Sequence, residues 1–413
     1  MQRFIKTLNT PTARSSALYY FGNFAVGGGR YLFHLLLLRL LLPSEYGEFL
    51  AYLSLLYLLG IPSTTVNNVV VKFVAEYRGK KDHRSINELF YYLIEKLTPY
   101  SLLLGLPLIF FSNILSTIFK AHSLAFVILG LSLFISIIST VIRSYVLAFQ
   151  RFTAQILIGF AEVSFTLFLA FVFIRLGMSA TGAVLAQIIA GIIAVIITFI
   201  LIRHEVLPPL FHTKKHFPLS TFTGYSLIYA IGSMSLISTD VLTTRFFFSE
   251  HLSGIYSSLS VLGRTIYFGL GPLIALVLPI ASHRQSATGS SRSVFVKLGG
   301  TVFGLGLAAT TVFSLFPKLI VSVISGANYL EAVPYLPIFA VSMLLFSLNL
   351  FTISYFMAIG RAKVNTFLLL ATIAQPVLIT LFHTSLNQVI WVNLSLESAL
   401  FLLLLWQIKQ QRI

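Results

Sequence analysis

The sequence has few charged residues and no cysteine. Of its 413 residues, 10% are charged and 57% are hydrophobic, and the mean hydropathy is +0.91. Because a soluble chain carries roughly a quarter charged residues, this composition excludes a soluble globular protein. The lack of cysteine excludes disulfide bonds, thiol catalysis, iron–sulfur clusters and thiolate zinc sites.

Sequence motifs for cofactor chemistry are also missing. The chain has no GxxxxGK[ST] phosphate loop, no HExxH and no cluster of cysteine and histidine. We therefore expect no catalytic residues, no metal and no cofactor, and leave coupling to Na⁺ or H⁺ open.

Long apolar stretches recur along the whole chain. A bilayer about 30 Å thick needs roughly 20 apolar residues per helix, so the pattern predicts an all-α integral membrane protein with twelve transmembrane helices. We place these spans at residues 16–42, 49–73, 97–118, 121–149, 154–176, 181–202, 219–247, 254–281, 294–316, 335–359, 364–382 and 389–406.

The distribution of positive charge predicts how the chain is oriented. Of the 28 lysine and arginine residues, 20 fall in the loops on the side of the termini and 5 on the opposite side. Cytoplasmic loops carry the excess of positive charge, so we expect a multi-pass protein of the cytoplasmic membrane with both termini in the cytoplasm. This topology accounts for most of the net charge of +16 and requires no nucleic acid as a partner.

The two halves of the chain match each other at an offset of 206 residues. The matched pairs include Arg39 with Arg245, Ala75 with Ala281 and Arg78 with Arg284. Six spans per half give both halves the same orientation, so the repeat predicts two parallel six-helix lobes around a central cavity. We expect the lobes at residues 1–203 and 219–413, with a cytoplasmic linker at 204–218.

Several stretches resemble one transporter family. They are LLLPSEYGEF at residues 40–49, VKFVAEYRG at 71–79, STDVL at 238–242, SSLSVLGR at 257–264 and GANYLEAVPYL at 326–336. The sequence is similar to the oligosaccharide flippases (O-antigen and teichoic-acid exporter type) of the multidrug, oligosaccharidyl-lipid and polysaccharide exporter superfamily.

The resemblance implies a function in cell-surface polysaccharide biosynthesis. It implies a secondary transporter, not an enzyme, that moves a polyisoprenyl-pyrophosphate-linked oligosaccharide across the membrane by alternating access. The implied partners are this lipid-linked glycan, membrane lipids, and a glycan polymerase or glycosyltransferases of the same pathway. The alternative is a multidrug or cation antiporter of the same superfamily.

Arginines at membrane depth are candidates for binding the pyrophosphate. Arg30 lies in the first span and Arg264 in the eighth, and ionisable residues within spans are often functional. Two guanidinium groups facing a shared cavity can clamp a pyrophosphate. The alternative for Arg30 is an ion pair within its own lobe. His34 lies one helical turn from Arg30, where it is either a further cationic ligand or a neutral hydrogen-bonded residue.

Three carboxyl groups at membrane depth leave alternatives open. Asp240 and Arg264 lie at depths that differ by about 5 Å on adjacent antiparallel helices, so they form either an internal salt bridge or two separate functional groups. Glu162 and Glu397 have no partner visible in the sequence. Each is either an ion-coupling site or a protonated packing residue.

Three basic residues lie near the predicted cytoplasmic ends of spans. Lys72 and Arg284 end spans two and eight, and Arg143 is about one and a half turns from the end of span four. They either guide headgroups into a cytoplasmic entrance or anchor the helices in the positively charged inner side.

The sequence also predicts irregular backbone. Residues 27–29, 62–68 and 269–272 contain glycine, proline and polar residues that either interrupt spans one, two and eight or let neighbouring helices pack closely at small side chains. Residues 85–97 begin with a capping-box pattern and continue at helical spacing, which predicts a short amphipathic helix on the membrane surface.

Overall fold

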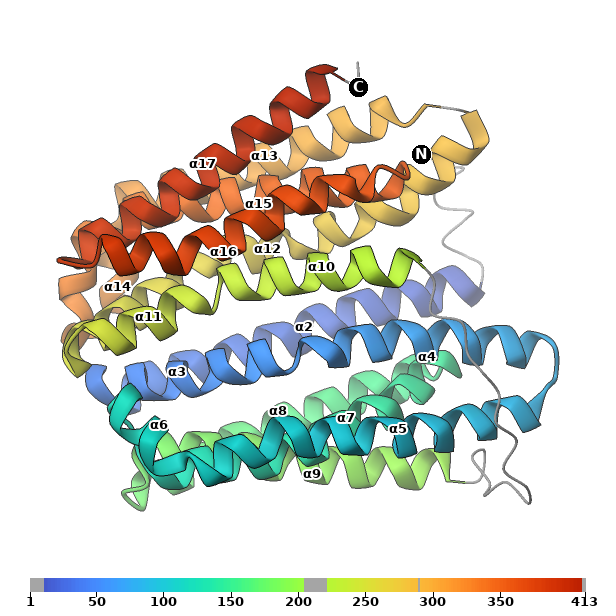
Figure 1. The fold of residues 1–413 in the computed structure, drawn as a ribbon, viewed down its shortest axis with the longest axis horizontal. Helices are drawn as coiled ribbons and strands as arrows, with labels where there is room; N and C mark the ends of the chain where they lie inside the picture. Colours follow the sequence, from blue (N-terminus) through green and yellow to red (C-terminus); the bar gives the residue numbers. More distant parts are fainter. Residues whose placement is uncertain (1–10, 204–220, 289, 411–413) are drawn as a thin grey trace. The chain divides into compact units, whose positions relative to one another are not determined.

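The computed structural model describes residues 11–203, 221–288 and 290–410, which form helices joined by short connections (Figure 1). Within these ranges, ten helical segments are long and apolar enough to cross a membrane. Helix α2 and the pair α3–α4 are further helices at the places of the first two predicted spans. The predicted all-α membrane fold is therefore confirmed.

The first six spans occupy the N-terminal half of the chain. They are α2 (Pro11–Leu40), α3 (Pro43–Leu59) with α4 (Ile61–Gly79), α5 (His83–Phe110), α7 (Ser123–Ala148), α8 (Phe152–Arg175) and α9 (Ser179–Ile202). A short helix, α6 (Ser112–Phe119), follows the third span.

The last six spans repeat this order. They are α10 (Thr221–Leu236) with α11 (Thr239–Phe247), α12 (Glu250–Thr288), α13 (Arg292–Leu315), α15 (Leu336–Ala358), α16 (Asn365–Leu381) and α17 (Leu386–Gln410). The short helix α14 (Pro317–Ile324) follows the ninth span as α6 follows the third, and the 3₁₀ segments Ala327–Tyr335 and Ala362–Val364 complete the described chain. The matching order of elements agrees with the internal repeat.

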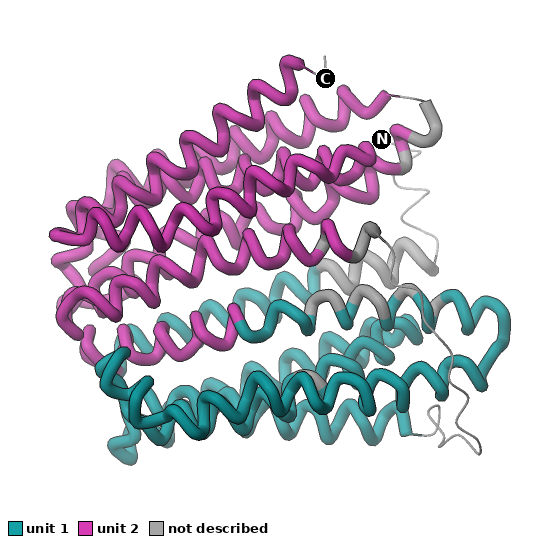
Figure 2. The backbone as a smooth tube through the Cα atoms, in the orientation of Figure 1, with its two compact units in different colours: residues 1–40, 59–219 teal, residues 41–58, 220–413 magenta. Residues whose placement is uncertain are grey.

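The chain divides into two compact units, which Figure 2 colours separately. Unit 1 contains residues 1–40 and 59–219, and unit 2 contains residues 41–58 and 220–413. The helix α3, although it belongs to the N-terminal half of the sequence, is thus part of unit 2. The expected lobe and linker boundaries remain a prediction, and the linker lies outside the described residues.

Of the three predicted interruptions, one occurs near its predicted place: the break lies two residues before residues 62–68, which are themselves helical in α4. The second span is broken at Gly60, between α3 and α4, where Pro62 occupies the first turn of α4 and needs no hydrogen-bond acceptor for its nitrogen. By contrast, α2 continues through residues 27–29 and α12 through 269–272, so the predicted interruptions of spans one and eight are wrong.

The predicted amphipathic surface helix is part of the third span. Helix α5 begins at His83, two residues before the predicted Ser85, because Asp82 caps it and accepts a hydrogen bond from the Ser85 backbone nitrogen at 3.0 Å. The apolar side chains of its first turns, Ile86, Leu89, Phe90 and Leu93, are buried in a cluster with residues of α4 and α7. Packing inside the protein, not contact with the membrane surface, therefore accounts for their spacing.

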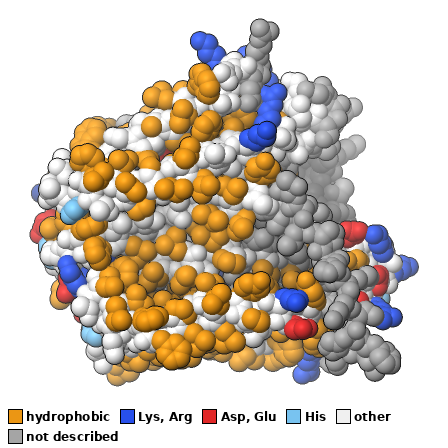
Figure 3. All heavy atoms as spheres, viewed as in Figure 1, with side chains coloured by type: hydrophobic (Ala, Val, Ile, Leu, Met, Phe, Trp, Pro, Cys, Tyr) orange, Lys and Arg blue, Asp and Glu red, His pale blue; other side chains and the backbone are white. Residues whose placement is uncertain are grey.

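Hydrophobic side chains are spread over the protein surface, as Figure 3 shows for one face. Large apolar residues such as Phe168 and Phe171 of α8 and Leu402 of α17 are exposed. In water so much exposed apolar surface would be unfavourable, whereas lipid chains cover it at little cost. The surface therefore agrees with a multi-pass membrane protein.

Candidate functional site

A cluster of three charged side chains lies within unit 1. Arg143 of α7 donates from Nη1 to Oε2 of Glu162 on α8 at 2.9 Å. Arg30 of α2 approaches the same oxygen with Nη2 at 3.6 Å. Two guanidinium groups therefore share one carboxylate oxygen, and the cluster carries one net positive charge when all three groups are ionised.

The three members differ in exposure. The side chain of Arg30 is 63% exposed, and that of Glu162 is 19% exposed. The backbone before Arg30 is also open, because a Cβ atom at Gly27 or Gly28 would have no neighbour within 4 Å. Gly29, in contrast, packs against Val163 of α8, where a Cβ atom would lie 2.7 Å from a methyl carbon. This close approach of α2 and α8 holds Arg30 beside Glu162.

The cluster changes the interpretation of two predicted residues. Glu162 has the partner that the sequence does not reveal, and Arg143 pairs with it in addition to lying near the end of α7. A side chain that only snorkels to the interface does not need such a partner. His34 lies half-buried on α2, with its ring centroid 6.0 Å from that of Phe33.

Unit 2 contains a buried polar network around Asp240. Arg264 of α12 donates from Nη2 to Oδ1 of Asp240 at 3.0 Å, and both side chains are 3% exposed. The hydroxyl of Tyr256 donates to Oδ2 of Asp240 at 2.8 Å. Of the alternatives for Asp240 and Arg264, the structure shows the internal salt bridge, so Arg264 offers no exposed guanidinium group to a ligand here.

The network continues through amide side chains. Asn393 of α17 donates to the Tyr256 hydroxyl at 2.9 Å, and Gln375 of α16 donates to Asn393 Oδ1 at 2.9 Å and to the Leu236 carbonyl oxygen at 2.9 Å. Leu236 is the last residue of α10, where the seventh span breaks. The amide of Gln375 therefore satisfies a carbonyl group that the broken helix leaves without its usual partner.

Glu397 lies in the same unit, and its described hydrogen-bond donor is an asparagine. It is 4% exposed, and its Oε2 accepts from Asn349 Nδ2 of α15 at 2.7 Å, while the same nitrogen donates to the Glu397 carbonyl oxygen at 3.0 Å. This pair ties α15 to α17. Its role in ion coupling stays a prediction.

The three predicted entrance residues are not brought together by a described contact. Arg143 joins the Glu162 cluster, Arg284 is exposed near the end of α12, and the side chain of Lys72 lies outside the described residues. Near the end of α4, Arg78 donates to the Phe149 carbonyl oxygen at 2.7 Å and lies over the Phe149 ring at 5.8 Å. Arg78 thus links the ends of α4 and α7.

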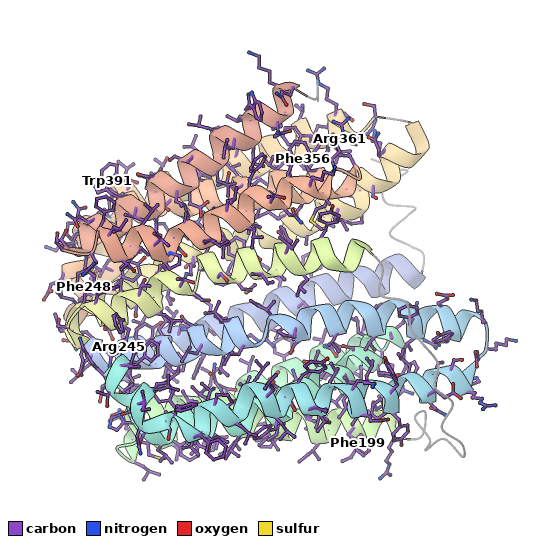
Figure 4. All side chains as sticks on the ribbon, in the orientation of Figure 1. Phe199, Arg245, Phe248, Phe356, Arg361 and Trp391 are labelled. Atoms are coloured by element: carbon purple, nitrogen blue, oxygen red, sulfur yellow. The ribbon has the colours of Figure 1, made fainter. Side chains whose placement is uncertain are left out.

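Helix α3 is fixed within unit 2 by another buried arginine. Arg245, labelled in Figure 4 at the end of α11, is 1% exposed and donates to the Ser44 carbonyl oxygen at 3.1 Å and to Ser253 Oγ at 3.1 Å. The Tyr329 hydroxyl donates to the Leu41 carbonyl oxygen at 3.2 Å. These bonds place α3 against α11, α12 and the Ala327–Tyr335 segment.

Sequence reasoning that considers only ionisable groups misses several of these residues. Tyr256, Asn349, Gln375 and Asn393 are uncharged, and all four are at least 95% buried. The available signal was an amide or hydroxyl within an apolar span, because such a group needs a hydrogen-bond partner there. In the described ranges, no group of three His, Asp or Glu side chains is arranged to hold a metal ion.

Known proteins share both sequence and fold features with this chain. The sequence profile of the family described as "Polysaccharide biosynthesis protein" matches residues 36–334. No curated protein sequence matches the chain.

Solved structures of transporters share the fold. An inward-facing multidrug resistance MATE family transporter of the MOP superfamily has a TM-score of 0.71 at 14% identity, covering 92% of this chain and 95% of its own. The lipid II flippase MurJ in an inward closed conformation has a TM-score of 0.71 at 13% identity, covering 95% of this chain and 87% of its own. The MATE multidrug transporter DinF-BH has a TM-score of 0.71 at 13% identity, with coverages of 98% and 97%.

Proposed function

The chain belongs to the polysaccharide biosynthesis protein family, and from this premise we propose that it is a membrane transporter that flips a polyisoprenyl-pyrophosphate-linked oligosaccharide. In this proposal the protein works by alternating access in the cytoplasmic membrane, with both termini in the cytoplasm, and catalyses no covalent reaction. Glycosyltransferases of the same pathway would supply the lipid-linked oligosaccharide, and a glycan polymerase would use it after transport.

The observation that carries the proposal is the exposed guanidinium group of Arg30. The Arg30 side chain as a whole is 63% exposed, and its contact with Glu162, at 3.6 Å, is longer than a good charge-assisted hydrogen bond. A guanidinium group that is ordered by a carboxylate yet open on its other side suits a bidentate anion such as a phosphate. Arg143 forms an ion pair with the same carboxylate oxygen and adds a second cationic group to the site.

A cation antiporter suits the described geometry less well. It would need an accessible carboxylate for the cation, but Glu162 and Asp240 each accept from an arginine, and Glu397 is buried against Asn349. The similar structures of multidrug transporters share the fold at 13–14% identity, which by itself does not assign a cargo.

The test is native mass spectrometry of the purified protein with its co-purifying lipids. We expect a polyisoprenyl-pyrophosphate glycan in the wild type, its loss in Arg30→Ala, and its retention in Arg39→Ala, which removes an exposed arginine from the far end of the same helix. A wild-type protein without such a lipid that binds organic cations in a pH-dependent way would refute the proposal and favour the antiporter.

A further inference from the structure

We propose that Glu162 is an internal substitute for the phosphate: it occupies the anion position between Arg30 and Arg143 when the site is empty, and a diphosphate displaces it. This inference rests on the proposed function, since it concerns the same site. It adds a specificity-determining residue and an explanation of how a highly charged headgroup is released.

The geometry places one oxygen where an anion would bind. Oε2 of Glu162 lies 2.9 Å from Arg143 Nη1 and 3.6 Å from Arg30 Nη2, so the two nitrogens are no farther apart than both distances together, 6.5 Å. Non-bridging oxygens on the two adjacent phosphorus atoms of a diphosphate can reach both guanidinium groups. A single phosphate has fewer oxygens to divide between them.

The cluster retains unused donor capacity. Arg143 Nε is buried and has no hydrogen-bond partner among the described residues, and most of the Arg30 side chain is exposed. A carboxylate with two oxygens leaves part of the ten N–H groups of two guanidinium groups unpaired. A diphosphate, with more oxygens and more charge, can satisfy more of them.

Glu162 also explains how the empty site is stable. Without it, two guanidinium groups would lie within a few ångströms of each other with no anion between them, and their like charges would repel. With Glu162 present, substrate binding must break an existing ion pair, which lowers the affinity. The same carboxylate competes with the bound headgroup and therefore promotes its release.

Binding of geranyl pyrophosphate and geranyl monophosphate to the full-length protein in detergent tests the inference. We expect Glu162→Gln to bind the pyrophosphate about tenfold more tightly than the wild type, which corresponds to ~1.4 kcal/mol. It should also prefer pyrophosphate over monophosphate less strongly, because a single phosphate no longer has to displace a carboxylate. Glu331→Gln is the matched control: it removes the same charge from an exposed pair with His251 and should bind as the wild type does.

Each other outcome has a defined meaning. If Arg30→Ala weakens binding but Glu162→Gln binds as the wild type does or less tightly, Glu162 is not the substitute anion and the proposed function stands. If neither the wild type nor Glu162→Gln binds either compound, both proposals are overturned. Glu162→Asp keeps the negative charge on a shorter side chain, so its affinity for the pyrophosphate should fall between those of the wild type and Glu162→Gln. If the glutamine variant does not fold, this variant tests the inference in its place.

Discussion

The contact between α3 and α12 within unit 2 depends on the absence of a side chain at Gly254. A Cβ atom there would lie 1.7 Å from the Pro43 carbonyl oxygen and 2.2 Å from the Pro43 carbonyl carbon. These are backbone atoms, so no change of rotamer can relieve the overlap. We therefore expect Gly254→Ala to push α3 away from α12.

The size of the effect follows from what the displacement disturbs. Overpacking of a well-packed contact costs about 1–3 kcal/mol, and losing the hydrogen bond from Arg245 to the Ser44 carbonyl oxygen adds about 1.5–3 kcal/mol because the donor is charged. We expect a loss of roughly 2.5–6 kcal/mol on the sum of these terms. Gly269→Ala on the same helix is the control, since a Cβ atom at Gly269 has no neighbour within 4 Å.

Two measurements check this prediction. Thermal unfolding in detergent should show a lower transition temperature for Gly254→Ala and an unchanged or slightly higher one for Gly269→Ala, because alanine favours helices over glycine. Because the natural chain has no cysteine, Ser253→Cys supplies a unique thiol at a position that is 1% exposed. Maleimide should label this thiol slowly in the variant with Ser253→Cys alone and quickly in the variant that also carries Gly254→Ala. Equal unfolding temperatures together with a protected thiol would refute the reasoning.

Two further predictions concern the buried Arg264 and Arg78, which links the ends of α4 and α7. Arg264→Ala should lower the free energy of unfolding by about 3–5 kcal/mol because it leaves Asp240 charged and buried without its cation. Thermal unfolding should show that adding Asp240→Asn restores part of this loss. A double variant no more stable than Arg264→Ala would count against the salt bridge. Arg78→Ala should lower the free energy of unfolding by about 1–3 kcal/mol, since it removes a charge-assisted hydrogen bond to the Phe149 carbonyl oxygen. Amide hydrogen exchange should become faster at the end of α7, and an unchanged exchange rate there would contradict this link between α4 and α7.

The sequence by itself determined the class of fold and much of its order. Long apolar stretches specify membrane helices because the bilayer core offers no hydrogen-bond partner to the backbone, and the 206-residue offset specifies a duplication. Counting residues along two antiparallel helices also predicted that Asp240 and Arg264 lie at similar depths, because the rise per residue is constant in a helix. The salt bridge was therefore one of two stated alternatives.

The tertiary structure alone decided the partners that depend on helix rotation and crossing. Glu162 meets Arg30 because α2 approaches α8 at Gly29, and it meets Arg143 across the pair α7 and α8. No spacing within one helix reports which face meets a neighbour. Helix α3 belongs to unit 2 because Gly254 admits the Pro43 backbone and Arg245 reaches the Ser44 carbonyl oxygen. The residues in these α3 contacts lie about half the chain length apart, so local pattern cannot specify them, whereas close packing in three dimensions does.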